Sequence, residues 1–167
     1  MGLFSKLFGK EEKVTELKLS AYMKGKVVDL SSVPDPVFAE KMMGDGFAII
    51  PEEGKLVSPV KGEIIQVFPT KHAFGIKTVG GVEILIHVGL ETVAMKGEGF
   101  DVLVEAGDKV EVGQPLLNYD LEAVREKAKD IITPCVITSG DSVESLTVSK
   151  VHETVDYSEE VAVLKLK

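Results

Sequence analysis

Cysteine, histidine and aromatic residues are scarce in this chain, and each shortage narrows what the protein can be. There is one cysteine, Cys135, no tryptophan, and an aromatic content of 6%. A single cysteine excludes an internal disulfide and a cysteine-based zinc cluster, and it fits the reducing environment of the cytosol. The chain holds three histidines, so a site built on imidazole rings has few residues to draw on.

Basic residues are also in deficit. The chain has 19 Lys and Arg against 27 Asp and Glu, which leaves a net charge of −8. This balance argues against nucleic-acid binding, because phosphate backbones demand clustered Lys and Arg. It favours protein partners with basic surfaces. The alternative is that the negative charge serves only to keep the protein soluble.

A long hydrophobic run is absent as well. The apolar stretch at residues 1–10 is short and carries Lys6 and Lys10, so we expect no secretory signal, no membrane span, and a soluble cytoplasmic protein. Leu and Phe at helical spacing between the lysines predict weak contact with an anionic membrane surface, and a tail without any partner is the alternative. We expect residues 1–16 to form a flexible amphipathic tail ahead of one folded domain over residues 17–167.

What the chain does contain is a series of short β-branched runs separated by glycines. These runs are residues 26–30, 48–50, 63–67, 102–104, 110–112 and 161–164. Many short strands at such spacing predict an all-β fold, here an antiparallel β-sandwich or barrel-sandwich hybrid.

Two further patterns refine this fold. Residues 23–30 and 60–67 echo each other, each with a glycine ahead of a strand, which indicates a duplicated motif. One or two short helices are expected, and the clearest covers residues 120–129 with Asp120 as its N-cap. This helix is expected to cover the sheet.

The run at residues 82–89 predicts a strand with two different faces. One face is wholly aliphatic and belongs to the core: Val82, Ile84, Ile86 and Val88. His87 lies on the opposite face beside Leu85, where an imidazole can meet a ligand or a partner.

A second histidine stands upstream of this strand. Gly80 and Gly81 suit a tight hairpin turn that would pair residues 73–78 with the strand. The pairing would bring His72 close to His87 in one shallow site. The alternative is two unrelated surface histidines.

Two imidazoles with a hydroxyl nearby suit phosphoryl transfer. A neutral imidazole nitrogen is a competent nucleophile, His72 can supply a donor to the phosphoryl oxygens, and Thr70 can hold the tautomer of His72. The glycines of the chain do not form a nucleotide-binding loop, and no carboxylate cluster for Mg²⁺ stands out. We therefore expect a phosphoprotein as the donor rather than ATP, with neither a metal nor a cofactor.

Apolar residues gather around the expected site and predict a docking face. They occur in the Pro34- and Pro36-containing loop, before Pro69, and beside His87: Val37, Phe38, Met42, Met43, Phe68 and Leu85. Asp35 and Glu91 would add an acidic rim for arginines of a partner. The alternative is that Phe38, Met42 and Met43 only pack on the core.

Several long segments resemble one known family. Residues 34–41, 43–49, 70–76, 81–93 and 96–100 look like the glucose-class enzyme IIA of the bacterial phosphoenolpyruvate-dependent sugar phosphotransferase system. The resemblance runs from about residue 20 to the end of the chain. Leu85, Met43 and Glu91 depart from the family pattern in shape rather than chemistry.

The resemblance implies a β-sandwich in which His87 accepts phosphate from the phosphocarrier HPr and passes it to the IIB domain of a glucose-type sugar permease. It also implies that His72 stabilises the phosphoryl group and that Thr70 supports His72. The docking face and rim that it implies are Val37, Phe38, Met43, Phe68 and Leu85, with Asp35 and Glu91.

Two other protein classes fit the sequence less well. A zinc hydrolase needs three protein ligands around its metal, and the remaining histidine, His152, lies in a polar stretch. A biotinyl or lipoyl carrier is suggested by residues 104–117, but Asn118 and Tyr119 lead straight towards the helix with no lysine to modify.

Overall fold

The computed structural model describes residues 15–167, and the expected tail at residues 1–16 lies almost wholly outside them. The strands are β1 (Glu16–Ser20), β2 (Gly25–Asp29), β3 (Gly46–Pro51), β4 (Lys55–Val57), β5 (Gly62–Val67), β6 (Ala73–Thr78), β7 (Glu83–His87), β8 (Phe100–Val102), β9 (Lys109–Val110), β10 (Pro115–Tyr119), β11 (Thr133–Ile137), β12 (Val143–Val148), β13 (Thr154–Val155) and β14 (Glu160–Leu166). The helices are α1 (Pro36–Ala39) and α2 (Leu121–Lys127).

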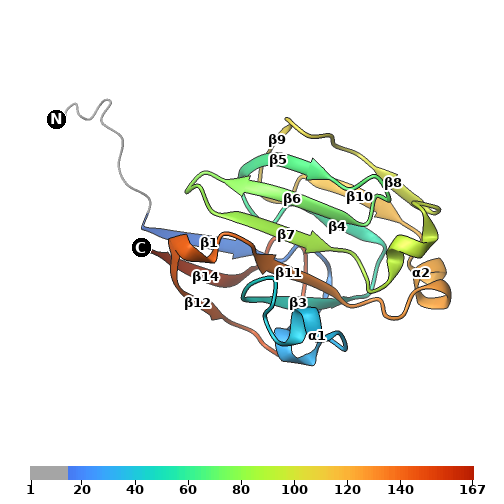
Figure 1. The fold of residues 1–167 in the computed structure, drawn as a ribbon, viewed down its shortest axis with the longest axis horizontal. Coiled ribbons are helices and arrows are strands. Elements are labelled where there is room, and N and C mark those ends of the chain that lie inside the picture. The colour runs from blue at the N-terminus through green and yellow to red at the C-terminus, as the bar shows by residue number, and fades with distance from the viewer. Residues whose placement is uncertain (1–14) are drawn as a thin grey trace.

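The described strands form three antiparallel sheets, which confirms the all-β sandwich. The large sheet has the order β13-β2-β3-β11-β7-β6-β5-β9, and the smaller ones are β1-β14-β12 and β4-β10-β8. Figure 1 shows β5, β6, β7 and β11 running side by side across the molecule, with α1 below them and α2 at one edge. No helix among residues 15–167 is long and apolar enough to cross a membrane.

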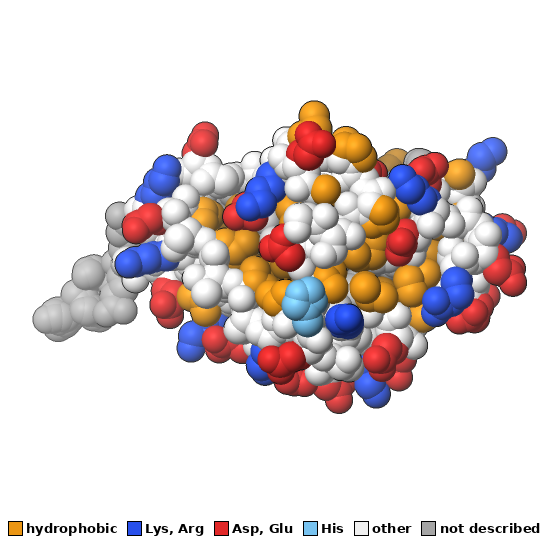
Figure 2. All heavy atoms as spheres, turned by 90° about the horizontal axis from the view of Figure 1, so that it is seen from below, with side chains coloured by type: hydrophobic (Ala, Val, Ile, Leu, Met, Phe, Trp, Pro, Cys, Tyr) orange, Lys and Arg blue, Asp and Glu red, His pale blue; other side chains and the backbone are white. Residues whose placement is uncertain are grey.

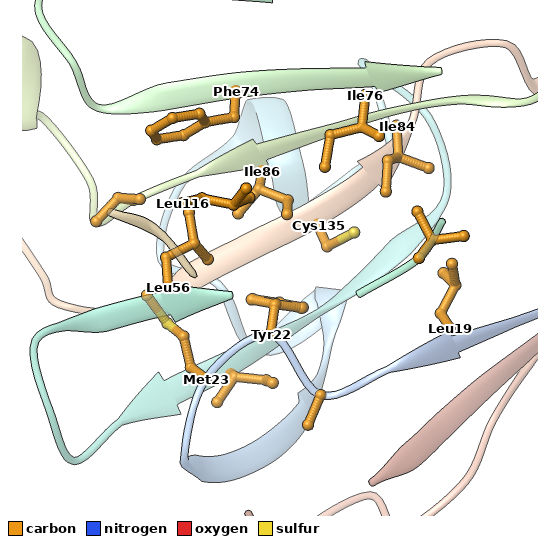
Figure 3. Close-up of a cluster of buried hydrophobic side chains, with 14 of the residues drawn as sticks. Leu19, Tyr22, Met23, Leu56, Phe74, Ile76, Ile84, Ile86, Leu116 and Cys135 are labelled. Atoms are coloured by element: carbon orange, nitrogen blue, oxygen red, sulfur yellow. The ribbon is translucent and has the colours of Figure 1, made fainter. Parts of the chain in front are cut away.

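The main core lies between the sheets and receives the aliphatic face predicted for β7. Ile84 and Ile86 point into it together with Phe74 and Ile76 of β6 (Figure 3). Leu85 points the other way, into a second cluster that we call the outer cluster. Its members are Val28, Leu30, Val33, Phe38, Ala48, Ala73, Leu85, Leu90, Ile132 and Val136, with Met43 and Phe68 packed against it. The strand therefore separates the core from the surface that carries the histidines.

The expected duplication corresponds to two equivalent strand starts. Gly25 opens β2, which pairs with β3, and Gly62 opens β5, which pairs with β6. A Cβ at either glycine would collide with a backbone carbonyl oxygen of the paired strand. The same close approach of two backbones therefore requires glycine in both copies.

The helices match the sequence in part. Asp120 caps α2 as predicted, since its carboxylate accepts from the Ala123 N–H. The helix ends at Lys127 rather than at residue 129, because the chain becomes extended at Ala128 and the Lys129 N–H donates to the Leu90 carbonyl. The Pro34- and Pro36-containing segment, expected as a loop, forms the short helix α1.

Candidate functional site

The predicted hairpin brings the two histidines together. Strands β6 and β7 are antiparallel with Ala73 opposite His87, so His72, just before β6, lies beside the end of β7. The Val88 N–H donates to the His72 carbonyl at 2.6 Å. The two imidazole ring centres are 4.7 Å apart, at an interplanar angle of 73°. The expected convergence of the rings is confirmed.

The two rings differ in how a partner can reach them. His72 is buried, with 4% of its surface exposed, whereas His87 is partly exposed. A phosphoryl group carried by another protein must approach from solvent. His87 is therefore the more accessible of the two nitrogen nucleophiles.

A backbone carbonyl decides which nitrogen of His87 carries the proton. The Nδ1 atom lies 2.7 Å from the Gly89 carbonyl oxygen. Because a carbonyl only accepts, Nδ1 must be the protonated nitrogen, and in the neutral ring Nε2 keeps its lone pair. Burial lowers the pKa of His87, while the Gly89 carbonyl and the charge of Asp35 raise it. The balance favours the neutral ring that a nucleophile requires.

His72 is held by its neighbour in the preceding turn. The Thr70 Oγ1 lies 2.5 Å from the His72 Nδ1, and the Lys71 N–H closes the turn on the Phe68 carbonyl at 2.7 Å. Burial, and then the neighbouring His87, lower the pKa of His72 to about 4. His72 is therefore neutral near pH 7. In this state one ring nitrogen carries a proton and can donate a hydrogen bond.

Aromatic rings flank the histidine pair on both sides. The Phe68 ring lies 5.5 Å from the His72 ring, nearly perpendicular to it, and the Phe38 ring lies 5.3 Å from the His87 ring. The four rings form one row in the order Phe38, His87, His72 and Phe68. The phenyl groups limit water around the imidazoles and restrict their rotation.

Most residues expected at the docking face belong to the outer cluster or pack against it, and they differ in how far they are exposed. Phe38 and Leu85 are buried at 5% and 8% exposure, so they offer only edges to a partner. Met43 and Phe68 are half-buried, and Val37 is exposed at 40%. Figure 2 views the side on which α1 and β3 lie in Figure 1, and hydrophobic side chains form a band across it with charged residues around them.

The two expected rim residues occupy different settings. Asp35 is half-buried, and its carboxylate accepts from the Val37 N–H at 2.9 Å, which makes it the N-cap of α1. Sequence reasoning missed this helix, although an aspartate followed by proline at the first helical position is a start signal. Glu91 is exposed and follows Gly89 by two residues, with a backbone φ of 58°.

The third histidine does not join the pair. His152 is exposed between β12 and β13, and its backbone N–H donates to the Val27 carbonyl of β2. In the large sheet β2 is separated from β7 by β3 and β11. Within residues 15–167 no group of three or more His, Cys, Asp and Glu could hold a metal ion. The alternative of a biotinyl or lipoyl carrier has no lysine to support it either, because β10 runs directly into the Asp120 cap of α2.

A cavity of about 230 Å³ lies elsewhere, at the ends of β5, β6 and β9. Its lining residues belong to these strands and the residues beside them: Lys61, Gly62, Glu63, Lys77, Thr78, Val79, Lys109, Val110 and Glu111. Neither His72 nor His87 contributes to it. The histidine pair instead lies beside the outer cluster, with His87 partly exposed and His72 buried behind it, and this arrangement suits docking of a protein.

The chain matches one protein-family model and several named proteins. The family model described as "phosphoenolpyruvate-dependent sugar phosphotransferase system, EIIA 1" matches residues 17–143. The chain is similar to the "PTS system glucose-specific EIIA component" of Halalkalibacterium halodurans, with 53% identity over 164 residues, covering 91% of this chain and 95% of the relative. The protein of that name from Bacillus cereus is 57% identical over 144 residues, covering 86% and 87%.

A solved structure agrees with these sequence matches. The structure titled "glucose permease IIA from Mycoplasma capricolum" superimposes with a TM-score of 0.83 at 39% identity, covering 93% of this chain and all of the other.

Proposed function

The chain belongs to the EIIA 1 family of the phosphoenolpyruvate-dependent sugar phosphotransferase system, and we propose that His87 is the residue on which it carries the phosphoryl group. Members of this family are phosphotransferase components that act in sugar transport, and they receive phosphate from HPr and deliver it to a IIB domain. One observation carries the assignment to His87. Its Nδ1 proton is held by the Gly89 carbonyl, which leaves the lone pair on Nε2 of the more accessible ring.

The transfer step follows from this arrangement. The Nε2 lone pair of His87 attacks phosphorus, the bond between phosphorus and the HPr histidine breaks, and its electron pair returns to that nitrogen. No proton has to leave the nucleophile, because Nε2 carries none. The ring gains positive charge during attack, and the Gly89 carbonyl dipole, already aligned with the Nδ1 proton, stabilises that charge.

His72 and Thr70 assist from the other side of the site. The His72 ring is close enough to His87 to donate a hydrogen bond to a phosphoryl oxygen. Because its lowered pKa keeps it neutral, it holds no extra proton that it could pass to His87. The Thr70 hydroxyl holds His72 Nδ1 and keeps the ring in place. A hydrogen bond to one ring nitrogen commonly sets the orientation of an imidazole.

Partners dock beside the histidines, on the exposed Val37 and on the accessible part of the outer cluster. Val37 and the edges of Phe38, Met43, Phe68 and Leu85 supply the apolar contact, with Asp35 and Glu91 as its acidic rim. The net charge of −8 favours partners whose docking surfaces are basic.

The names of the relatives support the finer assignment of the acceptor. Because they are called glucose-specific components, we assign delivery to the IIB domain of a glucose-type permease. We propose the cytoplasm as the site of the relay, because the family's system depends on phosphoenolpyruvate, a metabolite of that compartment. The domain boundary near residue 17 and weak membrane contact through residues 1–10 stay predictions.

The test uses purified protein incubated with phosphoenolpyruvate, enzyme I and HPr. We expect one acid-labile, base-stable phosphate per chain, and none on the His87→Ala protein. His152→Ala is the matched control, because it removes an exposed imidazole far from the pair and should leave uptake unchanged. Phosphate on the His87→Ala protein would contradict the assignment.

A further inference from the structure

The carbonyl that orients His87 belongs to a residue with an unusual backbone. Gly89 has a φ of +70°, which L side chains rarely adopt. A Cβ there would also lie 2.8 Å from the Thr92 Cγ2 and 3.0 Å from the Asp130 carbonyl oxygen. The chain turns sharply at Gly89, and this turn directs the carbonyl back to Nδ1 of His87.

Buried threonines hold the peptide group just before that turn. The Val88 carbonyl accepts from the Thr92 hydroxyl at 2.7 Å, and the Gly89 N–H donates to the Thr133 hydroxyl oxygen at 3.3 Å. Both contacts act on the one peptide group between Val88 and Gly89, from its two ends. Thr92 and Thr133 each have 0% exposure, so water cannot replace either hydroxyl.

The surrounding hydrogen bonds determine the direction of this network. The Thr133 hydroxyl donates to the Ile131 carbonyl at 3.1 Å, so its oxygen is the acceptor for Gly89. The next peptide group is held as well, because the Leu90 N–H donates to the Asp130 carbonyl at 2.9 Å. Both peptide groups that flank Gly89 are therefore anchored at the start of β11, one by Thr133 and the other by Asp130 just ahead of the strand.

We infer that Thr92 and Thr133 are positioning residues for phosphoryl transfer, because they clamp the peptide group between Val88 and Gly89 so that the Gly89 carbonyl keeps the proton of His87 on Nδ1. This inference rests on the proposed role of His87 for its kinetic consequence, but not for its effect on the tautomer. We call this pair of hydrogen bonds the threonine clamp.

The chemical consequence of losing the clamp is specific. The hydrogen bond made by one ring nitrogen decides which nitrogen carries the proton in a neutral imidazole. If the Gly89 carbonyl turns away, the proton is free to move to Nε2, and the lone pair that attacks phosphorus is lost. A merely structural role would lower stability and leave the tautomer of the folded molecules unchanged.

The test compares Thr92→Val and Thr133→Val, which keep the shape of the side chain and remove the hydroxyl, with Thr92→Ser and Thr133→Ser, which keep it. Thr78→Val is the matched control, because Thr78 is also buried at 4% exposure but its hydroxyl has no hydrogen-bond partner. The readouts are the ¹⁵N chemical shifts of the His87 ring in unphosphorylated protein and the initial rate of uptake from phospho-HPr.

We expect the wild type, both Ser variants and Thr78→Val to hold the proton on Nδ1. Each Val variant of the clamp should show a mixture of the two tautomers and a rate lower by about tenfold, the lower end of the loss seen when partners that orient metal-bound imidazoles are removed. Val variants with the wild-type tautomer, or Ser variants that behave like the Val variants, would overturn the inference.

Two further measurements keep the outcome decisive. If a Val variant does not fold, hydrogen exchange of the wild-type Gly89 amide decides the matter, since the clamp requires a strongly protected amide and rapid exchange would refute it. If His87→Ala still takes up phosphate, the proposed function fails, but the tautomer comparison still tests the clamp by itself.

Discussion

The imidazole of His72 meets that of His87 nearly at a right angle, with ring centres 4.7 Å apart. One ring is buried and the other is partly open to solvent. Burial lowers the pKa of both, so neither carries a charge that would repel the other near neutral pH. The pair thus combines an accessible nucleophile with a neutral neighbour that can contact the transferred group.

The first prediction separates these two roles. His72→Gln should still reach full phosphate uptake, because His87 remains and an incubation run to its end point tolerates a slow step. Turnover from phospho-HPr to the IIB acceptor should fall by about a hundredfold, since a misplaced donor stabilises the charged oxygens poorly. End-point labelling and steady-state sugar phosphorylation measure the two quantities. Loss of labelling in His72→Gln would indicate that His72 itself accepts phosphate.

The second prediction concerns stability against pH. The pKa of His72 falls from 6.5 to about 4 on folding, so between these values the unfolded chain binds a proton that the folded chain does not. The stability contributed by this group is complete above pH 6.5 and decreases as the pH falls towards 4. The lowered pKa of His87 acts in the same direction.

Urea unfolding at pH 7, 5.5 and 4.5 measures this dependence. We expect the free energy of unfolding to fall less steeply with pH in His72→Gln than in the wild type. His152→Gln, at an exposed position, should follow the wild-type curve. Parallel curves for the wild type and His72→Gln would refute the assigned cause.

The third prediction tests the docking face. Val37→Asp places a charge on an exposed apolar position next to Phe38, and it should raise the KM for phospho-HPr by about tenfold because the charge loses water on docking. Val112→Asp is the control, since Val112 is exposed to a similar degree, 46% against 40%, but follows β9 at the far edge of the large sheet. Equal effects of the two changes would place docking elsewhere.

The fourth prediction concerns a buried hydrogen bond between Tyr22 and Thr133 and its contribution to stability. The Tyr22 hydroxyl donates to the Thr133 carbonyl at 2.7 Å, and Tyr22 is fully buried. Tyr22→Phe leaves that carbonyl without its donor and should cost about 1–3 kcal/mol of unfolding free energy in urea titration. Tyr157→Phe loses an exposed hydrogen bond to Glu53, so it should cost less than about 1 kcal/mol. A Tyr22→Phe protein as stable as the wild type would show that the bond contributes nothing.

Local pattern was enough for several parts of this structure. Alternation placed Ile84 and Ile86 in the core and His87 on the other face, and the paired glycines at 80 and 81 indicated the hairpin. Asp120 indicated the start of α2. These features depend on residues only a few positions apart, so a single sequence carries them. The start of α2 was predictable but its end was not, because Lys129 bonds to Leu90 from a distant segment.

The sequence by itself determined the strand faces, the hairpin that pairs the two histidines, and, through long ordered motifs, the family. Only the tertiary structure decided which imidazole is buried, which nitrogen of His87 holds the proton, and which threonines hold the Gly89 peptide. The physical reason is distance along the chain. The hydrogen bond at His87 depends on Gly89, and Gly89 in turn is held by Thr133, a residue 44 positions further along the chain, which it meets only when β11 lies beside β7.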